Sequence, residues 1–362
     1  MSTVAVLGAG SWGTTLAIHL CQGGSRVRLW GNVREDLEAM VRDRENRKFL
    51  PGIGIPDGVK VLPGLEAALA GADFVFYVVP SQAVREVGER VARAGCRGRA
   101  VCAAKGLELG TLKRMSEVLR ECLGGQEPVI LTGPSHAEEV SRGIPTTVVA
   151  AATDEELGRA VQVLCSTPAF RVYTNTDVAG CEYAAALKNV IAIAAGVCDG
   201  IGWGDNTKGA LLTRGLAEIS RLGVELGGRR ETFFGLAGLG DLVTTAMSRH
   251  SRNRHVGEAI GRGRGLREVL GDMVMVAEGV TTSRAARDLG RARGVEMPIT
   301  EEVCAMLFDG KSPRDSLLAL MTRDLKSEQC HAPARRRGAA GPPRPAGRRS
   351  GPRRRPAPPR PP

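Results

Sequence analysis

The sequence lacks the closely spaced cysteines and histidines that metal centres and disulfide frameworks require. Its nine cysteines are dispersed, and its five histidines show no ligand spacing with cysteine or acid. An odd, scattered set of cysteines indicates reduced thiols in a cytoplasm. We therefore expect a cytoplasmic protein that holds no metal.

A long hydrophobic run and a leader are also missing. No apolar stretch approaches the roughly 20 residues that a membrane span needs, and the N-terminus passes directly into a strand-like run. A secretory leader has a basic segment followed by an apolar one at this place. We expect a soluble, intracellular protein with no transmembrane segment.

Acidic residues are absent from the end of the chain. Residues 331–362 hold ten arginines, ten of the twenty prolines and no acid, so the formal charge of +11 leaves only +1 on residues 1–330. This composition predicts a disordered Arg/Pro-rich tail. The tail either attracts nucleic acid or an anionic membrane weakly, or has no role. The near-neutral body indicates no specific nucleic-acid partner.

The first half of the chain carries a series of buried strands. Its apolar runs are continuous, which is typical of parallel strands covered on both faces. Loops and helical patterns follow them, so they predict repeated β-α units in a doubly wound α/β sheet. The expected strands are residues 3–7, 26–30, 73–80, 99–104, 128–131, 146–152 and 170–174.

A glycine turn directly follows the first strand. Gly8 permits a tight turn, Gly10 lets the backbone approach a pyrophosphate, and Gly13 lets the next helix pack closely on the strand. The N–H groups at the start of that helix favour an anion. Because the turn lies between a strand and a helix, it predicts a Rossmann-type dinucleotide site.

The second strand, residues 26–30, ends without an acid. A carboxylate at this place accepts hydrogen bonds from the ribose 2′-hydroxyl of NAD. Here Asn32 follows the strand, and Arg34 lies nearby. The cofactor is therefore NAD or NADP, and the sequence does not choose between them.

The second half of the chain is helical by pattern. A chain of 362 residues is long for one core, so two domains are expected. We assign residues 1–180 to the dinucleotide-binding domain and residues 181–330 to an all-helical substrate domain. Apolar residues recur at helical spacing in residues 210–226, 256–261, 281–292 and 300–308.

One cation, Lys188, lies inside an otherwise small and apolar helix at the start of this second half. Asp177 can cap the helix and Gly200 offers a stop. Burial would lower the pKa of the lysine from its reference of about 10.4, which permits proton exchange near neutral pH. The alternative is a lysine whose ammonium extends from a core helix to the surface.

Further polar groups lie in loops that the fold predicts at the cofactor edge of the sheet. Lys105 follows a strand, where ligands bind in such sheets, although a surface loop lysine is the alternative. Gly133 and Ser135 precede a helix and offer N–H and hydroxyl groups as an anion cradle. These groups are candidates for binding a charged substrate.

Two loops of the helical half add charged candidates. Asp241 ends a glycine-dense turn and either faces the site or caps the next helix. Ser251, Arg252 and Asn253 combine a guanidinium with hydroxyl and amide groups, which suits a phosphate ester. A solvated helix start is the alternative for this cluster, and an ordinary surface acid is the alternative for Glu278.

Long motifs resemble the bacterial NAD(P)-dependent glycerol-3-phosphate dehydrogenases from residue 4 to about residue 328. The Arg/Pro-rich tail has no counterpart in the family, and Asn32 stands where many members carry a basic residue. The motifs are GAGSWGT, NRKFLPG, VVPSQ, AKGLE, TGPSHAEEV, ALKNVIAIAAG, DGIGWGDNTKGALLTRGLAE, FFGLAGLGDLVTT, SRNR and EMPIT.

The resemblance implies reduction of dihydroxyacetone phosphate, a phosphorylated triose, to sn-glycerol 3-phosphate for phospholipid synthesis. It implies that Lys188 exchanges the proton at the C2 oxygen. It places Lys105, Gly133, Ser135, Asp241, Ser251, Arg252 and Asn253 around the substrate. It places Ser11, Trp12, Lys105, Ala137, Arg252, Val276 and Glu278 at the dinucleotide.

Other readings stay open beside this one. A related hydroxyacid dehydrogenase would share the architecture, and a nucleotide sensor would have lost catalysis. The sequence does not fix the oligomeric state, for which a homodimer is one option.

Overall fold

The computed structural model describes residues 1–325 and 327–328. The segment expected to form the Arg/Pro-rich tail, residues 331–362, lies outside the described residues. Residues Met1–Met321 form one unit, which contains every helix and strand discussed below.

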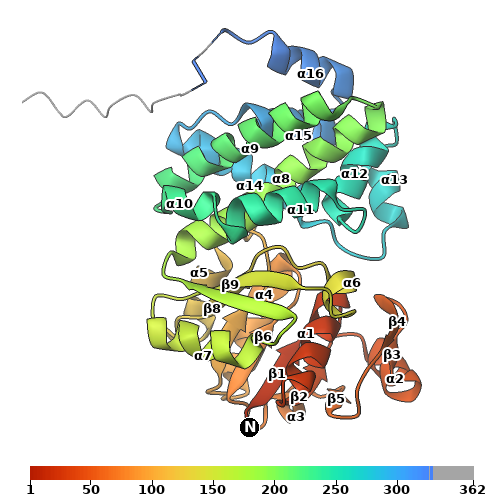
Figure 1. Ribbon diagram of the computed structural model, residues 1–362, viewed down its shortest axis with the longest axis vertical. Helices are drawn as coiled ribbons and strands as arrows, with labels where there is room; N and C mark the ends of the chain where they lie inside the picture. Colours follow the sequence, from red (N-terminus) through yellow and green to blue (C-terminus); the bar gives the residue numbers. More distant parts are fainter. Residues whose placement is uncertain (326, 329–362) are drawn as a thin grey trace, which may run out of the picture. The chain divides into compact units, whose positions relative to one another are not determined.

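An eight-stranded sheet forms the first half of this unit, with strand order β10-β9-β8-β7-β6-β1-β2-β5. The pairs are parallel except that β9 runs antiparallel to β8. Its strands are β1 (Thr3–Leu7), β2 (Arg26–Trp30), β5 (Val59–Leu62), β6 (Phe74–Tyr77), β7 (Arg99–Cys102), β8 (Val129–Thr132), β9 (Thr146–Ala151) and β10 (Phe170–Asn175). The expected doubly wound sheet is confirmed (Figure 1).

Two short strands that the sequence analysis did not predict form a separate antiparallel ribbon, β3 (Glu45–Asn46) and β4 (Leu50–Gly54). The edge strand β5 was missed as well. β3 has only two residues, β4 contains proline and glycine, and Lys60 interrupts the apolar residues of β5, so none of them forms the continuous apolar run that identified the other strands.

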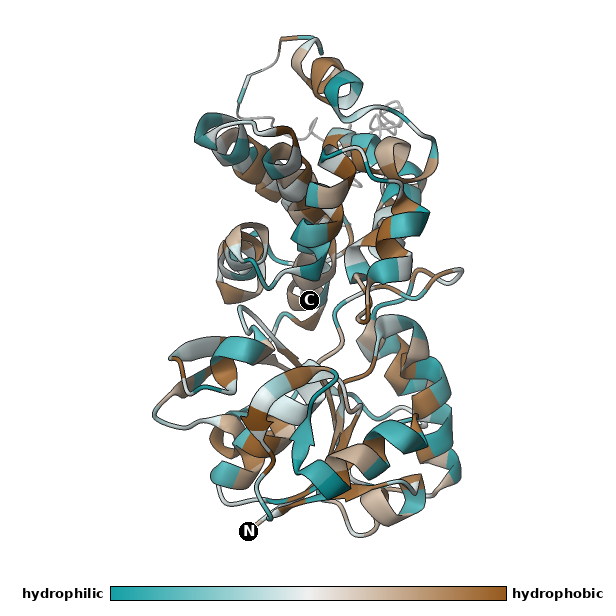
Figure 2. Ribbon diagram, turned by 90° about the vertical axis from the view of Figure 1, so that its right-hand side faces the viewer, coloured by the Kyte–Doolittle hydropathy of each residue, from teal (hydrophilic) through white to brown (hydrophobic). Residues whose placement is uncertain are grey.

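Helices cover both faces of the sheet, because successive apolar side chains of its strands point to opposite faces and form two sets in two separate cores. One set packs with α1, α2 and α7, and the other packs with α3, α4 and α5. Figure 2 shows apolar residues along these strands. The helices are α1 (Ser11–Gln22), α2 (Arg34–Asp43), α3 (Leu65–Leu69), α4 (Val84–Arg93), α5 (Met115–Cys122), α6 (Ala137–Val140) and α7 (Glu155–Cys165), with a 3₁₀ turn η1 (Ser81–Ala83).

The second half is helical, as expected. Its own apolar core is separate from the two cores of the sheet. The elements are α8 (Val178–Ile201), α9 (Asp205–Glu225), α10 (Arg230–Phe233), the π-helical turn η2 (Leu236–Gly240), α11 (Asp241–Met247), α12 (Arg252–Gly261), α13 (Leu266–Asp272), α14 (Glu278–Arg293), α15 (Pro298–Phe308) and α16 (Pro313–Met321).

Helix α8 is the central element of this half and contacts α9, α11, α12 and α14. It is long and apolar enough to cross a membrane, which the sequence analysis did not recognise, but 83% of its apolar window is buried inside the protein. The predicted cap is confirmed, because the Asp177 carboxylate accepts a hydrogen bond from the Gly180 N–H. The helix ends at Ile201, and the residue that caps it is Gly202, with φ of 83°, and not Gly200.

Gly200 serves the packing of α8 on α12 instead of ending the helix. A Cβ at Gly200 would lie 2.2 Å from the Glu258 carbonyl oxygen, and one at Gly196 would lie 2.0 Å from that of Arg254. From the other helix, a Cβ at Gly257 would lie 1.9 Å from the Ile193 oxygen. The two backbones therefore touch, which fixes the start of α12 against the middle of α8.

We predict that Gly257→Ala lowers the free energy of unfolding by about 3 kcal/mol, because the methyl group meets backbone atoms that cannot move aside. Urea unfolding followed by circular dichroism measures the loss. The control is Gly209→Ala in α9, where a Cβ would meet no atom within 4 Å. That variant should gain about 0.5–1 kcal/mol, and equal losses in both variants would contradict the close packing.

Candidate active site

Lys188 is buried in the middle of α8, with 4% of its surface exposed. Its Nζ donates to Asp241 Oδ1 at 3.0 Å and to Thr245 Oγ1 at 2.5 Å. The ammonium therefore does not extend to the surface, and the alternative of a surface lysine is wrong. Small neighbours such as Ala184 and Ala192 leave the ammonium to these polar partners.

Burial lowers the pKa of Lys188 to about 8, and the charges of Lys105 and Arg252 act in the same direction. Asp241 acts against them and keeps the lysine charged at neutral pH. Burial also acts to raise the pKa of Asp241, but Lys105 and Lys188 outweigh it, so this pKa lies below its ordinary value. An ammonium in this setting can give up and regain its proton near neutral pH.

Asp241 is the first residue of α11 and joins two lysines. Its second oxygen, Oδ2, accepts from Lys105 Nζ at 2.8 Å. Gly240 is the N-cap of α11, and the Asp241 carboxylate accepts from side chains instead, those of Lys105, Lys188 and Thr245, so the capping alternative is wrong. The carboxylate of Asp241 thus connects the loop after β7 with the central helix α8.

The loop after β8 contributes backbone and hydroxyl groups to this cluster. The Gly133 carbonyl oxygen accepts from Lys105 Nζ at 2.8 Å and from the Ser135 hydroxyl at 3.1 Å. Gly133 has φ of 126°, a conformation that favours glycine. Lys105 is therefore fixed by two partners and is not a freely solvated surface lysine.

The start of α12 lies against α8 beside Lys188. Ser251 is buried and caps α12 by accepting from the Arg254 N–H at 3.2 Å. The Asn253 amide donates to Asn189 Oδ1 at 2.9 Å and accepts from the Gly279 N–H at 2.8 Å. The predicted helix start is correct, but Ser251 and Asn253 are buried and not solvated.

The glycine turn has the geometry that a dinucleotide requires. A Cβ at Gly8 would lie 2.4 Å from the Val78 carbonyl oxygen and one at Gly13 would lie 1.8 Å from the Gly8 oxygen, whereas one at Gly10 would meet no atom within 4 Å. The twelve-residue helix α1 begins at Ser11, and Gly10 leaves its first N–H groups without a side-chain cap. These features fit a pyrophosphate at the start of α1.

The segment before α14 joins the two halves of the site. Met275 Sδ accepts from the Ser11 hydroxyl at 3.6 Å. Arg252 donates to the Val276 carbonyl oxygen at 3.0 Å. Glu278 accepts from the Ser81 N–H at 2.9 Å and from its hydroxyl at 2.5 Å. Glu278 is thus bound to the loop after β6, so the alternative of an ordinary surface acid is wrong.

The remaining predicted residues lie around the first strands. Trp12 packs on the sheet core, with its ring centroid 6.5 Å from that of Phe170. The Ala137 carbonyl oxygen accepts from Thr15 of α1 at 3.3 Å. Asn32 follows β2, where its side-chain oxygen accepts from Arg90 at 3.0 Å. Trp12 is thus part of the glycine turn, Ala137 contacts the helix that follows it, and Asn32 follows the neighbouring strand. Lys188, Lys105 and Asp241 form a cluster of their own.

Thr245 and Asn189 also belong to the site but were not predicted from the sequence. Thr245 follows Asp241 by four residues, so the two share a helix face, and helical spacing could have identified it. Asn189 neighbours Lys188 in the chain, but only the packing of α12 brings Asn253 to it. Such a contact between distant segments leaves no local signal.

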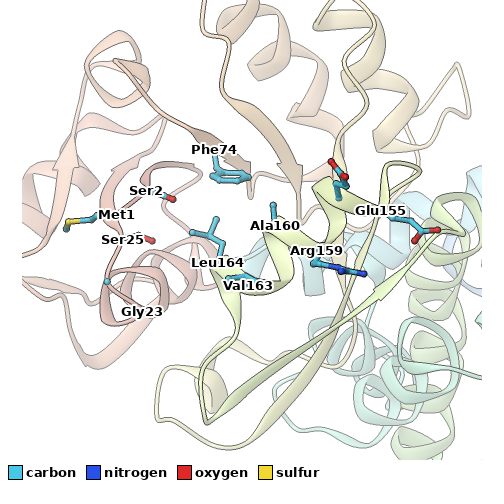
Figure 3. A pocket seen from close by; sticks show the side chains of 12 residues that line it. Met1, Ser2, Gly23, Ser25, Phe74, Glu155, Arg159, Ala160, Val163 and Leu164 are labelled. Atoms are coloured by element: carbon cyan, nitrogen blue, oxygen red, sulfur yellow. The ribbon is translucent and has the colours of Figure 1, made fainter.

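A hollow of about 840 Å³ lies at the edge of the sheet formed by the amino ends of its strands (Figure 3). Ser2, Ser25 and Phe74 line it, next to or at the amino ends of β1, β2 and β6. None of the predicted site residues lines it, and ligands of such sheets bind at the carboxyl ends of the strands. We therefore place the candidate site at the Lys188 cluster and the glycine turn.

Within residues 1–325 and 327–328, no group of three or more histidine, cysteine, aspartate or glutamate side chains is arranged to hold a metal ion. The eight cysteines in this part of the chain are free.

Comparison with known families gives two matches that cover most of the chain. Residues 3–158 match the model of the NAD-dependent glycerol-3-phosphate dehydrogenase N-terminus. Residues 177–318 match the model of the C-terminus of the same family. The first match ends within α7 and the second begins directly before α8.

The chain aligns with individual relatives along nearly their whole length. The chain is 55% identical over 329 residues to a glycerol-3-phosphate dehydrogenase [NAD(P)+] of Chlorobium limicola, covering 90% of this chain and 99% of the relative. It is 53% identical to one of Pelodictyon phaeoclathratiforme, with the same coverage. The crystal structure of glycerol-3-phosphate dehydrogenase from Coxiella burnetii superimposes with a TM-score of 0.86 at 36% identity, covering 89% of this chain and 99% of that one.

Proposed function

The chain belongs to the NAD-dependent glycerol-3-phosphate dehydrogenase family, and we propose that it interconverts dihydroxyacetone phosphate and sn-glycerol 3-phosphate with NAD(P)H. The buried ion pair between Lys188 and Asp241 carries the proposal, because it provides a proton donor that Lys105 connects to the loop after β7, at the same edge of the sheet as the glycine turn. In this proposal, residues 1–180 bind the dinucleotide and residues 181–330 bind the substrate. The enzyme works in the cytoplasm, as a homodimer, and supplies glycerol 3-phosphate for phospholipid synthesis.

The proton chemistry belongs to Lys188. A bound nicotinamide supplies or accepts the hydride at its C4 position. Lys188, as an ammonium, polarises the substrate carbonyl and gives its proton to the C2 oxygen. In the opposite direction the neutral amine of Lys188 removes that proton.

The neighbours of Lys188 determine its orientation and charge. Asp241 Oδ1 and the Thr245 hydroxyl fix the position of Nζ. Asp241 also binds Lys105, so one carboxylate holds two cations toward the space where a charged substrate binds. Two cations beside one anion leave a net positive charge, which favours a phosphorylated substrate.

Phosphate binding is assigned to the start of α12 and the loop after β8. Arg252 presents a guanidinium, and Ser251 and Ser135 present hydroxyls. Asn253 is held by Asn189 and the Gly279 N–H, and its amide keeps a second N–H for the substrate. Holding the phosphate in this way orients C2 for hydride transfer and lowers the entropic barrier.

A spectrophotometric assay of the full chain tests this function. We expect NADH or NADPH absorbance to fall on addition of dihydroxyacetone phosphate, and to change far less with a simple keto acid such as pyruvate. A preference for the keto acid would favour a hydroxyacid dehydrogenase. A stable absorbance with every substrate would indicate a nucleotide sensor, and either result would overturn the proposal.

The two directions should depend on pH with opposite signs. Reduction needs the Lys188 ammonium, so its kcat should fall as pH rises through about 8, the pKa that burial gives this lysine. Oxidation needs the neutral amine, so its kcat should rise over the same range. Initial rates in both directions from pH 6 to 10 at saturating substrate measure the two pH profiles of kcat. If kcat falls with rising pH in both directions, or rises in both, the role of Lys188 is contradicted.

A further inference from the structure

The carboxyl end of β2 lies against the glycine turn. The Gly8 N–H donates to the Trp30 carbonyl oxygen at 2.7 Å, and a Cβ at Gly31 would lie 2.8 Å from that of Ala9. Asn32, which comes next, is therefore at the place where such folds hold the adenosine ribose.

Two of the acids that follow Asn32 in α2 are paired with other side chains. Asp36 pairs with Lys48 Nζ at 2.8 Å, and Glu38 pairs with Arg34 Nε at 2.8 Å. Glu35, in the same first turn of α2, is exposed to solvent. The residue at the position just after β2, where such folds hold the carboxylate that selects the NAD ribose by its 2′-hydroxyl, is here Asn32.

A cation from a different element occupies this place. Arg90 lies in the last turn of α4, and its guanidinium carbon is 4.8 Å from the centroid of the Trp30 indole. One of its nitrogens, Nη1, donates to Asn32 Oδ1 at 3.0 Å. Glu86, one turn earlier, is 3.7 Å away and largely exposed. The stacking and the single short hydrogen bond orient the guanidinium and leave its other N–H groups for an anion.

We propose that Arg90 binds the 2′-phosphate of NADP, so that α4 and not the loop after β2 sets the cofactor preference. A planar guanidinium matches phosphate oxygens in pairs, and one already stacked on Trp30 loses little freedom on binding. Arg34, the cation that the sequence places after the strand, is exposed and paired with Glu38. The inference rests on the proposed function, because it names how that site selects its cofactor.

NAD binding should depend much less on Arg90. The Asn32 side chain carries both an acceptor and a donor, either of which can bind the ribose 2′-hydroxyl. Loss of Arg90 therefore removes a partner of the 2′-phosphate and leaves the partner of the 2′-hydroxyl in place. The chain should use both cofactors.

Isothermal titration calorimetry of the full chain tests the proposal with adenosine 2′,5′-bisphosphate and adenosine 5′-monophosphate as probes. Arg90→Gln keeps an amide that can stack on Trp30 but removes the charge. We expect it to weaken the bisphosphate at least about tenfold, as for a lost charge-assisted hydrogen bond. The monophosphate should change less than about twofold. The matched control Arg34→Gln should leave both affinities within about twofold.

Three results would overturn the proposal. These are equal losses for both probes in Arg90→Gln, no loss for either probe, or a selective loss in Arg34→Gln. KM values for NADPH and NADH with dihydroxyacetone phosphate separate this inference from the proposed function. If the unaltered chain turns over with neither cofactor, the proposed function fails, whereas the calorimetry still decides whether Arg90 binds the 2′-phosphate.

Discussion

Lys188→Ala should lower kcat for reduction of dihydroxyacetone phosphate by about a hundredfold to ten-thousandfold, the range for loss of a general acid. The variant loses the group that polarises the carbonyl and protonates the C2 oxygen. Asp241 then keeps only Lys105 as its cationic partner. The decay of NADH absorbance at pH 7 with saturating substrate measures the loss.

The control for this variant is Lys208→Ala. Lys208 also forms an ion pair within the helical half, with Asp199 at 2.6 Å, but it does not contact Asp241. Its kcat should stay within about threefold of the unaltered chain. A Lys188→Ala variant that binds NADH and yet keeps its kcat within the same limit would show that another group donates the proton.

Asp241→Asn should have the second largest effect. It leaves the ammoniums of Lys188 and Lys105 facing each other without a negative charge between them, so the pKa of Lys188 should fall below about 8. We expect kcat to fall by about a hundredfold at pH 7 and the alkaline limb of the reduction profile to move to lower pH. The variant should also lose about 3–5 kcal/mol of stability, because an uncompensated buried charge remains.

The pH profile separates this electrostatic role from simple destabilisation. Asp199→Asn is the matched control, since Asp199 pairs with Lys208 and Arg254 in the same helical half. The Asp199→Asn variant should lower the melting temperature but leave unchanged the pH at which kcat for reduction falls. An Asp241→Asn variant whose limb also stays in place would show that Asp241 only supports the fold.

The sequence predicts the parts of the fold that repeat a pattern over many residues. Continuous apolar runs identified seven of the sheet's eight strands, and the turn at Gly8 to Gly13 identified the cofactor edge. The short edge strand β5 and the β3–β4 ribbon lack such a pattern. The end of α8 was placed at Gly200 because a glycine is a typical helix stop, and only the structure shows that Gly200 packs against α12 inside the helix.

The sequence predicts which residues belong to the site, but not which of them bind one another. A lone lysine in an apolar helix indicates a catalytic residue. The sequence does not show, however, that Asp241 binds Lys105 as well as Lys188. It showed Arg34 as the cation near the end of β2, whereas the structure brings Arg90 to Asn32 from a helix some sixty residues along the chain. Contacts of this kind arise from the crossing of distant elements, which local spacing does not encode.

The central claim is that a buried lysine exchanges its proton near neutral pH, and nuclear magnetic resonance tests it most directly. Lysine labelled with ¹³C at the ε position reports the charge of each ammonium in the full chain as the pH is raised. We predict one lysine resonance that titrates at about 8, that is missing from Lys188→Ala, and that shifts to lower pH in Asp241→Asn. A spectrum in which every lysine titrates near the ordinary value of about 10.4 would contradict the account.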